Sequence, residues 1–197
     1  MYEYADKQIK DMNRRNLRAF SRLKQLKFDE LNILETVTKT FEDSIRLAKK
    51  RYYQIALAAY IAGIKRAKGR EKDTITEDWV LDMLEEYDPV TLYQFFPEAE
   101  RKKNRLIEAI IASHNKSDVI DRALRLWVLQ ITHYAEKSVD RATEDAYRDA
   151  GVEKVKWITA EDEKVCEVCR ERNGKIYPIN KIPPKPHYRC RCIVVPI

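Results

Sequence analysis

The spacing of apolar residues predicts long helices at the start of the chain. From about Asp29 onward, apolar side chains recur at steps of three and four residues, as on one face of an amphipathic helix. This stripe consists of Leu34, Val37, Phe41, Ile45, Ala48, Tyr52, Ile55 and Ala59. A looser helical pattern covers residues 4–26, and Gly63 and Gly69 are expected to weaken the end of the second segment.

Further helices are predicted after this one. Thr74 and Glu77 have the spacing of a capping box and would start a helix. A short amphipathic helix that carries Ile110 stops near His114-Asn115, and the helix that follows has Asn115, Ser117 and Asp118 as candidate N-caps. The inward positions of that last helix are Ile120, Ala123, Leu124, Trp127, Ile131, Tyr134, Ala135, Ser138 and Ala142. Because amphipathic helices bury their stripes on one another, residues 1–150 are expected to form an elongated helical bundle.

After the bundle the pattern changes from helical to extended. Val155 and Trp157 alternate with polar neighbours, as in a strand. A tight turn at Asn173-Gly174 would lead into a return strand. Four prolines then forbid regular structure before a last strand over residues 192–195. The chain is therefore predicted to be mainly α with a small β part, in which residues 151–197 form a separate β-rich module.

Charge is distributed unevenly along the chain. Residues 1–70 carry 17 basic and 8 acidic side chains, a net charge of +9. Residues 71–150 carry −7 and residues 151–197 carry +4. The basic first segment could face DNA phosphates or an acidic protein surface, pair with the acidic middle segment, or simply be solvated. No stretch approaches the ~18 to 20 apolar residues of a membrane span, so no membrane partner is expected.

All four cysteines and one of the three histidines lie close together in the module. The candidate ligands of a metal ion are Cys166, Cys169, His187, Cys190 and Cys192. Two thiolates three residues apart can hold one ion, and a second group of soft ligands can complete the tetrahedron that Zn²⁺ prefers. Cys166 and Cys169 are the firmest candidates. His187 with Cys190 would complete the set, but Cys192 could replace either of them.

Other uses of the cysteines are weighed against a metal site. Disulfides of a secreted mini-domain are not expected, because no signal peptide or long apolar run precedes the cysteines. A redox Cys-x-x-Cys pair would be expected beside a parallel sheet, which the pattern does not predict. Four unrelated reduced thiols would leave their clustering unexplained. Five candidates for four positions favour a closed, structural zinc site that staples a module too short for a large core.

The module carries its motifs in a specific order. They are Trp157-Ile-Thr-Ala-Glu-Asp162, Cys166-x-x-Cys169, Asn173-Gly174-Lys-Ile-Tyr177-Pro178 and Pro183-Pro184-x-Pro186-His187-x-x-Cys190-Arg191-Cys192. As a set, this order resembles the C-terminal region of the Mu F-like family, the minor capsid or head morphogenesis proteins of tailed bacteriophages. The family often has proline where this chain has Tyr188. Residues 88–108 also resemble a region in minor capsid proteins of phages that infect Gram-positive hosts.

The resemblance implies a structural protein of the phage head. Similar proteins sit on or near the portal in few copies and are implicated in head morphogenesis and in DNA packaging or ejection. The expected partners are the portal protein, the major capsid or scaffold protein, and packaged DNA through the basic residues 1–70. The expected location is the virion, with the host cytoplasm during assembly. The helical part is expected to contact the portal or scaffold, and the zinc module to act as a rigid docking knob.

A nucleic-acid-binding zinc protein is the alternative function. The module contains basic and aromatic side chains that could contact phosphates and stack on bases. They are Arg170, Arg172, Lys175, Lys181, Lys185, Arg189 and Arg191, with Tyr177 and Tyr188. An enzyme is not expected, because no Ser-His-Asp order, phosphate-binding glycine loop or His-Glu-x-x-His motif is present. The acidic run at residues 161–163 is interpreted as charges at a helix N-terminus.

Overall fold

The computed structural model describes residues 2–25, 30–69, 91–160, 162–187 and 190–197. Its helices in the first three quarters of the chain are α1 (Tyr2–Gln25), α2 (Glu30–Ala67), α4 (Thr91–Ala112) and α5 (Lys116–Asp149). The last quarter contains β1 (Lys154–Ile158), α6 (Glu167–Arg172), β2 (Ile176–Pro178) and β3 (Ile193–Pro196). A mainly helical fold with a small antiparallel sheet is therefore confirmed. The helix predicted to start at Thr74 lies outside the described residues.

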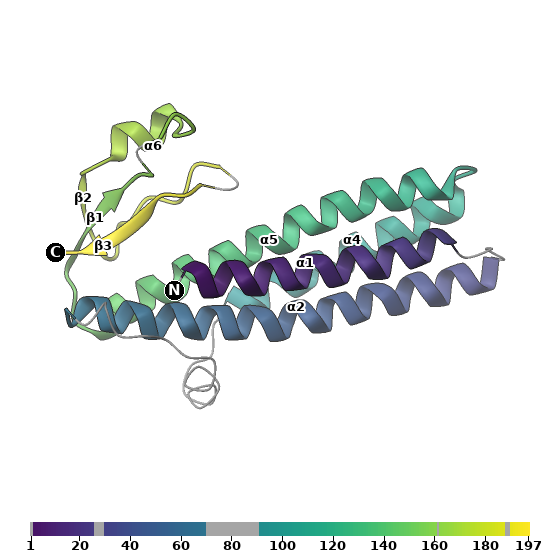
Figure 1. The fold of residues 1–197 in the computed structure, drawn as a ribbon, viewed down its shortest axis with the longest axis horizontal. Helices are drawn as coiled ribbons and strands as arrows, with labels where there is room; N and C mark the ends of the chain where they lie inside the picture. The colour runs from purple at the N-terminus through teal and green to yellow at the C-terminus, as the bar shows by residue number, and fades with distance from the viewer. Residues whose placement is uncertain (1, 26–29, 70–90, 161, 188–189) are drawn as a thin grey trace.

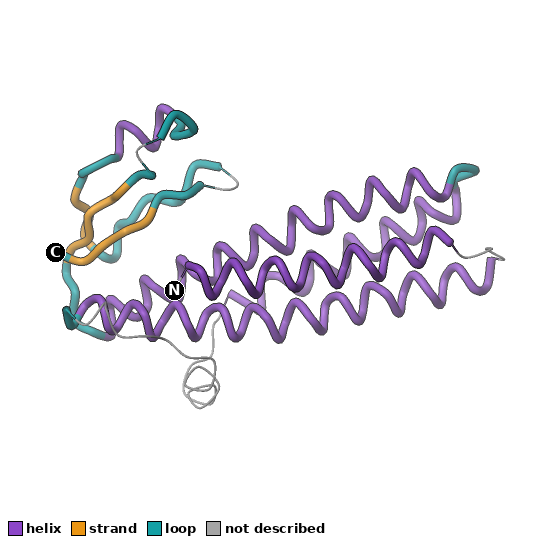
Figure 2. The backbone as a smooth tube through the Cα atoms, in the orientation of Figure 1, coloured by secondary structure: helices purple, strands orange, loops and turns teal. Residues whose placement is uncertain are grey.

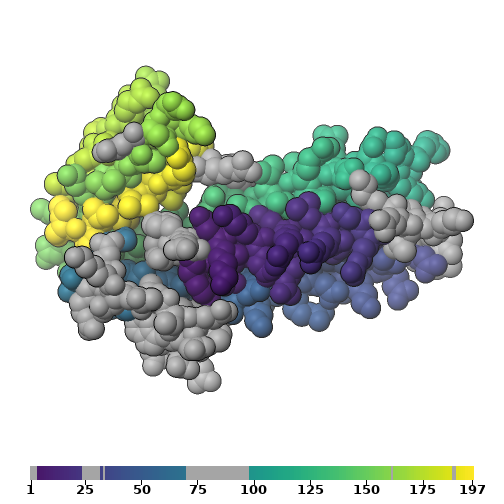
Figure 3. All heavy atoms as spheres, in the orientation of Figure 1, coloured from purple at the N-terminus to yellow at the C-terminus, as the bar shows by residue number. Residues whose placement is uncertain are grey.

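The four long helices lie side by side along the long axis of the molecule (Figure 1). The most extensive contact joins α2 and α5, and α1 and α4 each pack on both of them. The module that follows α5 forms a separate lobe at one end of the bundle (Figure 3). Within the described residues, no helix has the length and apolar character needed to cross a membrane. The division of the chain into two domains stays a prediction.

The core of the bundle follows the apolar stripes predicted for its helices. In α2, most of the predicted stripe is buried, with Phe41 and Tyr52 among its largest members. The Phe41 ring makes edge-to-face contacts with Phe20 of α1 at 5.0 Å and with Trp127 of α5 at 4.9 Å, between ring centroids. Leu34 was wrongly placed in the core, since 48% of it is exposed. It lies in the first turns of α2, where the bundle ends and fewer helices cover the stripe.

Gly63 has a packing role that its sequence position did not indicate. The helix continues through it and ends at Ala67, and the expectation that it weakens the end of α2 stays a prediction. A Cβ atom at Gly63 would lie 2.6 Å from the Cβ of Ala146 on α5. The missing side chain therefore lets the two longest helices approach closely. Gly69, with a φ angle of 68°, follows the true end of the helix.

Polar side chains interrupt the interface of α1 with α2 and α5. Arg51 of α2 donates to the Asp11 carboxylate at 2.7 Å, and Asn13 donates to the Thr132 hydroxyl at 3.1 Å. Gln130 of α5 is buried, yet neither atom of its side-chain amide has a hydrogen-bond partner among the described residues. Because an unsatisfied buried amide is destabilising, Gln130 is expected to reduce the stability of the bundle.

The turns on either side of α5 follow the predicted local signals. Asn115 is the N-cap, and its side chain accepts a hydrogen bond from the backbone N–H of Asp118 at 3.3 Å. Gly151 follows the end of the helix with a φ angle of 77°, as expected for a left-handed helix stop. The preceding helix was predicted too short: α4 begins at Thr91, well before the apolar residues that indicated it.

The module is built on a three-stranded antiparallel sheet in the order β2-β1-β3 (Figure 2). The predicted alternation in β1 is confirmed, because Val155 and Trp157 are buried while Lys156 is exposed. Trp157 pairs with Val194 of β3. Two polar contacts tie the module to the bundle. The Tyr147 hydroxyl donates to the backbone oxygen of Val194 at 3.3 Å, and the Lys185 ammonium pairs with Asp140 at 2.8 Å.

Candidate metal centre

The first cysteine pair lies at the start of a short helix that the sequence did not predict. Cys166 is the N-cap of α6, and its sulfur accepts a hydrogen bond from the backbone N–H of Cys169 at 3.4 Å. Cys169 lies in the first turn of α6 and is almost completely buried. The first turn of α6 therefore brings both sulfurs to one side of the chain.

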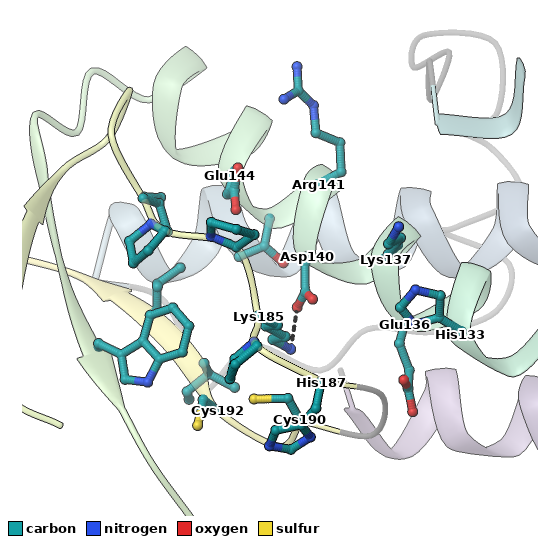
Figure 4. A pocket seen from close by; sticks show the side chains of 18 residues that line it. His133, Glu136, Lys137, Asp140, Arg141, Glu144, Lys185, His187, Cys190 and Cys192 are labelled. Carbon is teal, nitrogen blue, oxygen red and sulfur yellow. Dashed lines mark hydrogen bonds and ion pairs between the residues drawn. The ribbon is translucent and has the colours of Figure 1, made fainter. Parts of the chain in front are cut away.

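The second group of candidate ligands comes from the segment that leads into β3. Cys190 and Cys192 are both buried, whereas His187 is exposed. Figure 4 shows these three residues close together, with the sulfur of Cys190 beside the imidazole ring. The Cys190 sulfur lies 3.5 Å from the sulfur of Cys169. Two thiolates on one tetrahedral zinc would be about 3.8 Å apart, given Zn–S bonds of about 2.3 Å.

The five predicted ligands converge on Cys169. Its sulfur lies in one group with the ligand atoms of Cys166 and His187, and in a second group with those of Cys190 and Cys192. Within each group these atoms lie within 4.8 Å of one another. The five side chains are thus close enough to bind a metal ion, although their assignment as ligands stays a prediction.

A small cavity lies among these side chains. Its volume is about 20 Å³, and its walls include all five candidate ligands. A single water needs roughly 10–15 Å³ of such space, so the cavity has room for one small ion. Five soft candidate ligands around it can fill the four positions of a structural zinc site, whereas a catalytic zinc usually has three protein ligands.

Burial controls the protonation of the thiols. It raises the pKa of Cys169 well above its usual value, and neighbouring thiols raise it further. Burial is also the main cause of the raised pKa of Cys192. The pKa of Cys166 is lowered, chiefly by the hydrogen bond from the backbone N–H of Cys169. Cys169 and Cys192 therefore keep their protons at neutral pH, and a bound cation would have to displace them.

The competing uses of the cysteines can be compared with this geometry. All four cysteines are free thiols. The sulfurs meet at one point and do not form two separate pairs, as two disulfides would require. The sheet beside the Cys-x-x-Cys pair is antiparallel, unlike the parallel sheet expected next to a redox motif. The convergence favours metal binding over both alternatives.

Trp157 packs against the cysteine cluster. It is buried in one cluster with Cys169, Cys190 and Cys192, and its ring meets the ring of Tyr177 edge to face at 6.4 Å. Burial raises the pKa of the Cys192 thiol, while the Trp157 indole N–H interacts with the Cys192 sulfur and lowers that pKa by less. Such a donor could orient a metal-bound thiolate, because outer-shell hydrogen bonds commonly orient metal ligands.

Two arginines connect the loops around the cluster. The Arg172 guanidinium stacks over the Trp157 ring at 5.3 Å from its centroid and donates to the backbone oxygen of Pro184 at 2.8 Å. Arg191 pairs with the carboxylate of Asp162 at 2.6 Å. The interpretation of Asp162 as a charge at a helix N-terminus was therefore wrong. It lies ahead of α6 and binds the segment that carries Cys190.

These contacts weaken the alternative of a nucleic-acid-binding module. Arg172, Arg191 and Lys185 all bind groups of this chain. Figure 4 shows the Lys185–Asp140 ion pair across a groove of about 600 Å³ between α5 and the module. Arg189 and Tyr188 lie outside the described residues. Much of the predicted basic surface is therefore engaged in holding the module together.

The comparisons with known proteins agree with the motif order. Residues 98–195 match the model of the family described as Phage Mu protein F like protein. Over this range the chain belongs to the phage Mu F-like family. No curated protein and no solved structure gives a match. The matched range includes α5, the sheet and all five candidate ligands. Membership of this family indicates a phage protein related to the head or capsid, with a phage-associated location.

Proposed function

We propose that this phage Mu F-like protein is a structural component of the phage head that associates with the portal. The observation that carries the proposal is the family match, which spans α5 and the whole metal-centre module as one unit. The elongated bundle offers long helical faces to a partner, and the module stands apart at one end (Figure 3). In this arrangement the bundle contacts the portal or scaffold, and the module is a rigid docking knob.

The role proposed for the metal is to stabilise the fold. The ion is Zn²⁺, because thiolate and imidazole ligands around a small cavity suit zinc. Burial favours a set of four thiolates from Cys166, Cys169, Cys190 and Cys192, with the exposed His187 outside it. In this proposal the ion stabilises the fold and takes part in no reaction, so no enzymatic activity is proposed for the protein.

Co-expression tests the portal assignment directly. The full chain would be produced together with the portal, major capsid and scaffold proteins encoded by the same phage. The portal should co-purify with this chain in a stable complex, detectable by affinity capture and visible as rings by electron microscopy. Capture of the capsid or scaffold protein without the portal would contradict the proposal.

Paired surface variants locate the contact on the full chain. Leu126 and Leu129 are exposed apolar residues of α5, and Val168 and Ile176 are exposed apolar residues of the module. The double substitution Leu126→Glu/Leu129→Glu should reduce portal capture at least about tenfold, because large exposed apolar side chains often mark interfaces. The matched control Val168→Glu/Ile176→Glu should retain it. The opposite result would assign the portal contact to the module.

A further inference from the structure

A groove between α1 and α2 combines features that the proposed function does not explain. Its volume is about 360 Å³, and Arg15, Asn16 and Arg22 line it from α1. Lys39 and Ser44 are among the residues that line it from α2. Figure 3 shows α1 lying along α2 on the face turned toward the viewer. The groove is remote in sequence from the metal centre and belongs to the most basic segment of the chain, residues 1–70.

Asn16 provides an unused hydrogen-bond donor in this groove. Only 2% of the residue is exposed, and its side-chain nitrogen is buried without a hydrogen-bond partner among the described residues. An amide nitrogen can only donate, so it needs an acceptor. Leaving such a donor unsatisfied is destabilising, which makes an external acceptor at this point favourable.

Positive charge surrounds this donor. Arg22 and Lys39 are exposed, and neither forms an ion pair or hydrogen bond with another described residue. Arg15 pairs with Asp11 at 3.0 Å. The acidic residue of the groove, Asp43, is itself paired with an arginine of α2 at 3.4 Å. Two cations therefore remain available on opposite walls, one from each helix.

Ser44 adds a second donor to the floor of the groove. Its oxygen accepts a hydrogen bond from the indole N–H of Trp127 at 2.7 Å. The hydroxyl proton of Ser44 is therefore left to donate elsewhere. The groove thus combines neutral donors at its base with cations at its rim. That combination fits an anionic oxygen group, because such a group has acceptors and no donors.

We propose that the groove between α1 and α2 binds a backbone phosphate of double-stranded DNA. The inference rests on the proposed function in one respect, since a head protein works beside packaged DNA. The net charge of +9 on residues 1–70 supplies the attraction over longer distance. The basic residues of the module are less suited to this role, because several of them are bound to groups of the chain itself.

Charge-reversal variants of the full chain test this site against its surroundings. The test pair is Arg22→Glu/Lys39→Glu, and the control pair is Lys10→Glu/Lys50→Glu, which makes the same charge change on the same two helices outside the groove. Affinity for a labelled 20-base-pair duplex would be measured by fluorescence anisotropy at several salt concentrations. Circular dichroism melts would check that both variants fold.

The test pair should bind the duplex at least about tenfold more weakly than the control pair, with a salt dependence lower by about one phosphate contact, because both cations face the same phosphate. Equal weakening by both pairs would overturn the assigned site, and so would no binding by the unchanged protein. A second experiment measures the melting temperature of the protein with inorganic phosphate added. If phosphate raises the melting temperature while the duplex does not bind, the groove is a small-anion site and the DNA assignment is wrong. Portal capture is measured separately on the unchanged chain, and its absence there identifies failure of the proposed function, whereas equal duplex binding by the test and control pairs identifies failure of the groove assignment alone.

Discussion

The helical bundle and the C-terminal module solve the problem of stability in different ways. The bundle buries aromatic and aliphatic stripes from four long helices, with the rings of Phe20, Phe41 and Trp127 in contact across three of them. The core of the module consists largely of Trp157 and cysteine side chains. Buried apolar area can hold the bundle, whereas the smaller core of the module places five candidate metal ligands together. The comparison therefore sets a core of apolar side chains against a core that consists largely of thiols and depends, in our proposal, on a bound ion.

Metal removal should separate the two regions most strongly. Removal of the metal from the full chain with a chelator, under reducing conditions, is expected to unfold the module. In small domains with a structural metal, the free energy of metal binding supplies the free energy of folding. Helical circular dichroism should remain, since the helices bury their stripes without the ion. Amide signals of residues 151–197 in NMR spectra should collapse while those of α2 and α5 persist. If residues 151–197 keep their fold after complete metal loss, a metal ion does not stabilise the module.

Substitution of single ligands should sharpen the picture of the module. Cys192→Ser is expected to weaken metal binding by at least about 100-fold, because it removes a buried thiolate from the proposed set. His187→Ala should change affinity by about tenfold or less, since the imidazole is exposed. Cobalt substitution gives the readout, because the intensity of sulfur-to-cobalt absorption follows the number of thiolates. A larger loss with His187→Ala would replace the four-thiolate set by one that contains histidine.

A bulky residue at Gly63 should test how closely the bundle is packed. Gly63→Val is expected to destabilise the protein by about 1–3 kcal/mol, because its Cβ would overlap the Cβ of Ala146 on α5. The neighbouring substitution Ala62→Val serves as the control, since Ala62 is only half-buried and the change introduces the same β-branched side chain. Denaturant unfolding followed by helical circular dichroism measures both. Equal effects would show that helix propensity, not close approach, explains the loss.

The smallest change in stability is expected for buried polar side chains of the bundle. Gln130→Leu should stabilise the protein by about 1 kcal/mol, because both atoms of the buried amide lack partners among the described residues. Gln54→Leu is the matched contrast. The Gln54 side chain accepts a hydrogen bond from Arg51 at 2.9 Å, so its loss should be destabilising. The same denaturation experiment decides. A loss of stability with Gln130→Leu would mean that an ordered water or another group satisfies the amide.

Local signals in the sequence predicted the elements well and their packing less well. Asn115 and Gly151 marked the ends of α5 correctly because capping and helix-stop preferences act within a few residues. Alternation around Trp157 predicted β1 for the same reason. The exposure of Leu34 and the packing role of Gly63 were not predicted. Both depend on which helix lies opposite, and a local pattern does not show this.

The sequence predicted which residues form the candidate site, but it did not predict how the chain holds them in place. Clustering of soft ligands in the sequence identified Cys166, Cys169, Cys190, Cys192 and His187 as one group, and the structure brings them together. Nothing in the Cys-x-x-Cys spacing indicated that α6 would begin at the first cysteine. The pairing of Asp162 with Arg191 was also missed, because charges 29 residues apart carry no local signal of contact.

The sequence by itself determined the helical stripes, the capped turns, the strands of the module, the set of metal-binding residue types and the family resemblance. Each of these depends on neighbours within a turn or two of the chain, or on the order of motifs. Only the tertiary structure decided that Cys169 lies at the centre of the ligand group and that an unpaired Asn16 amide lies among cations between α1 and α2. Such arrangements arise because packing places distant segments together, and no periodicity along the chain encodes that distance.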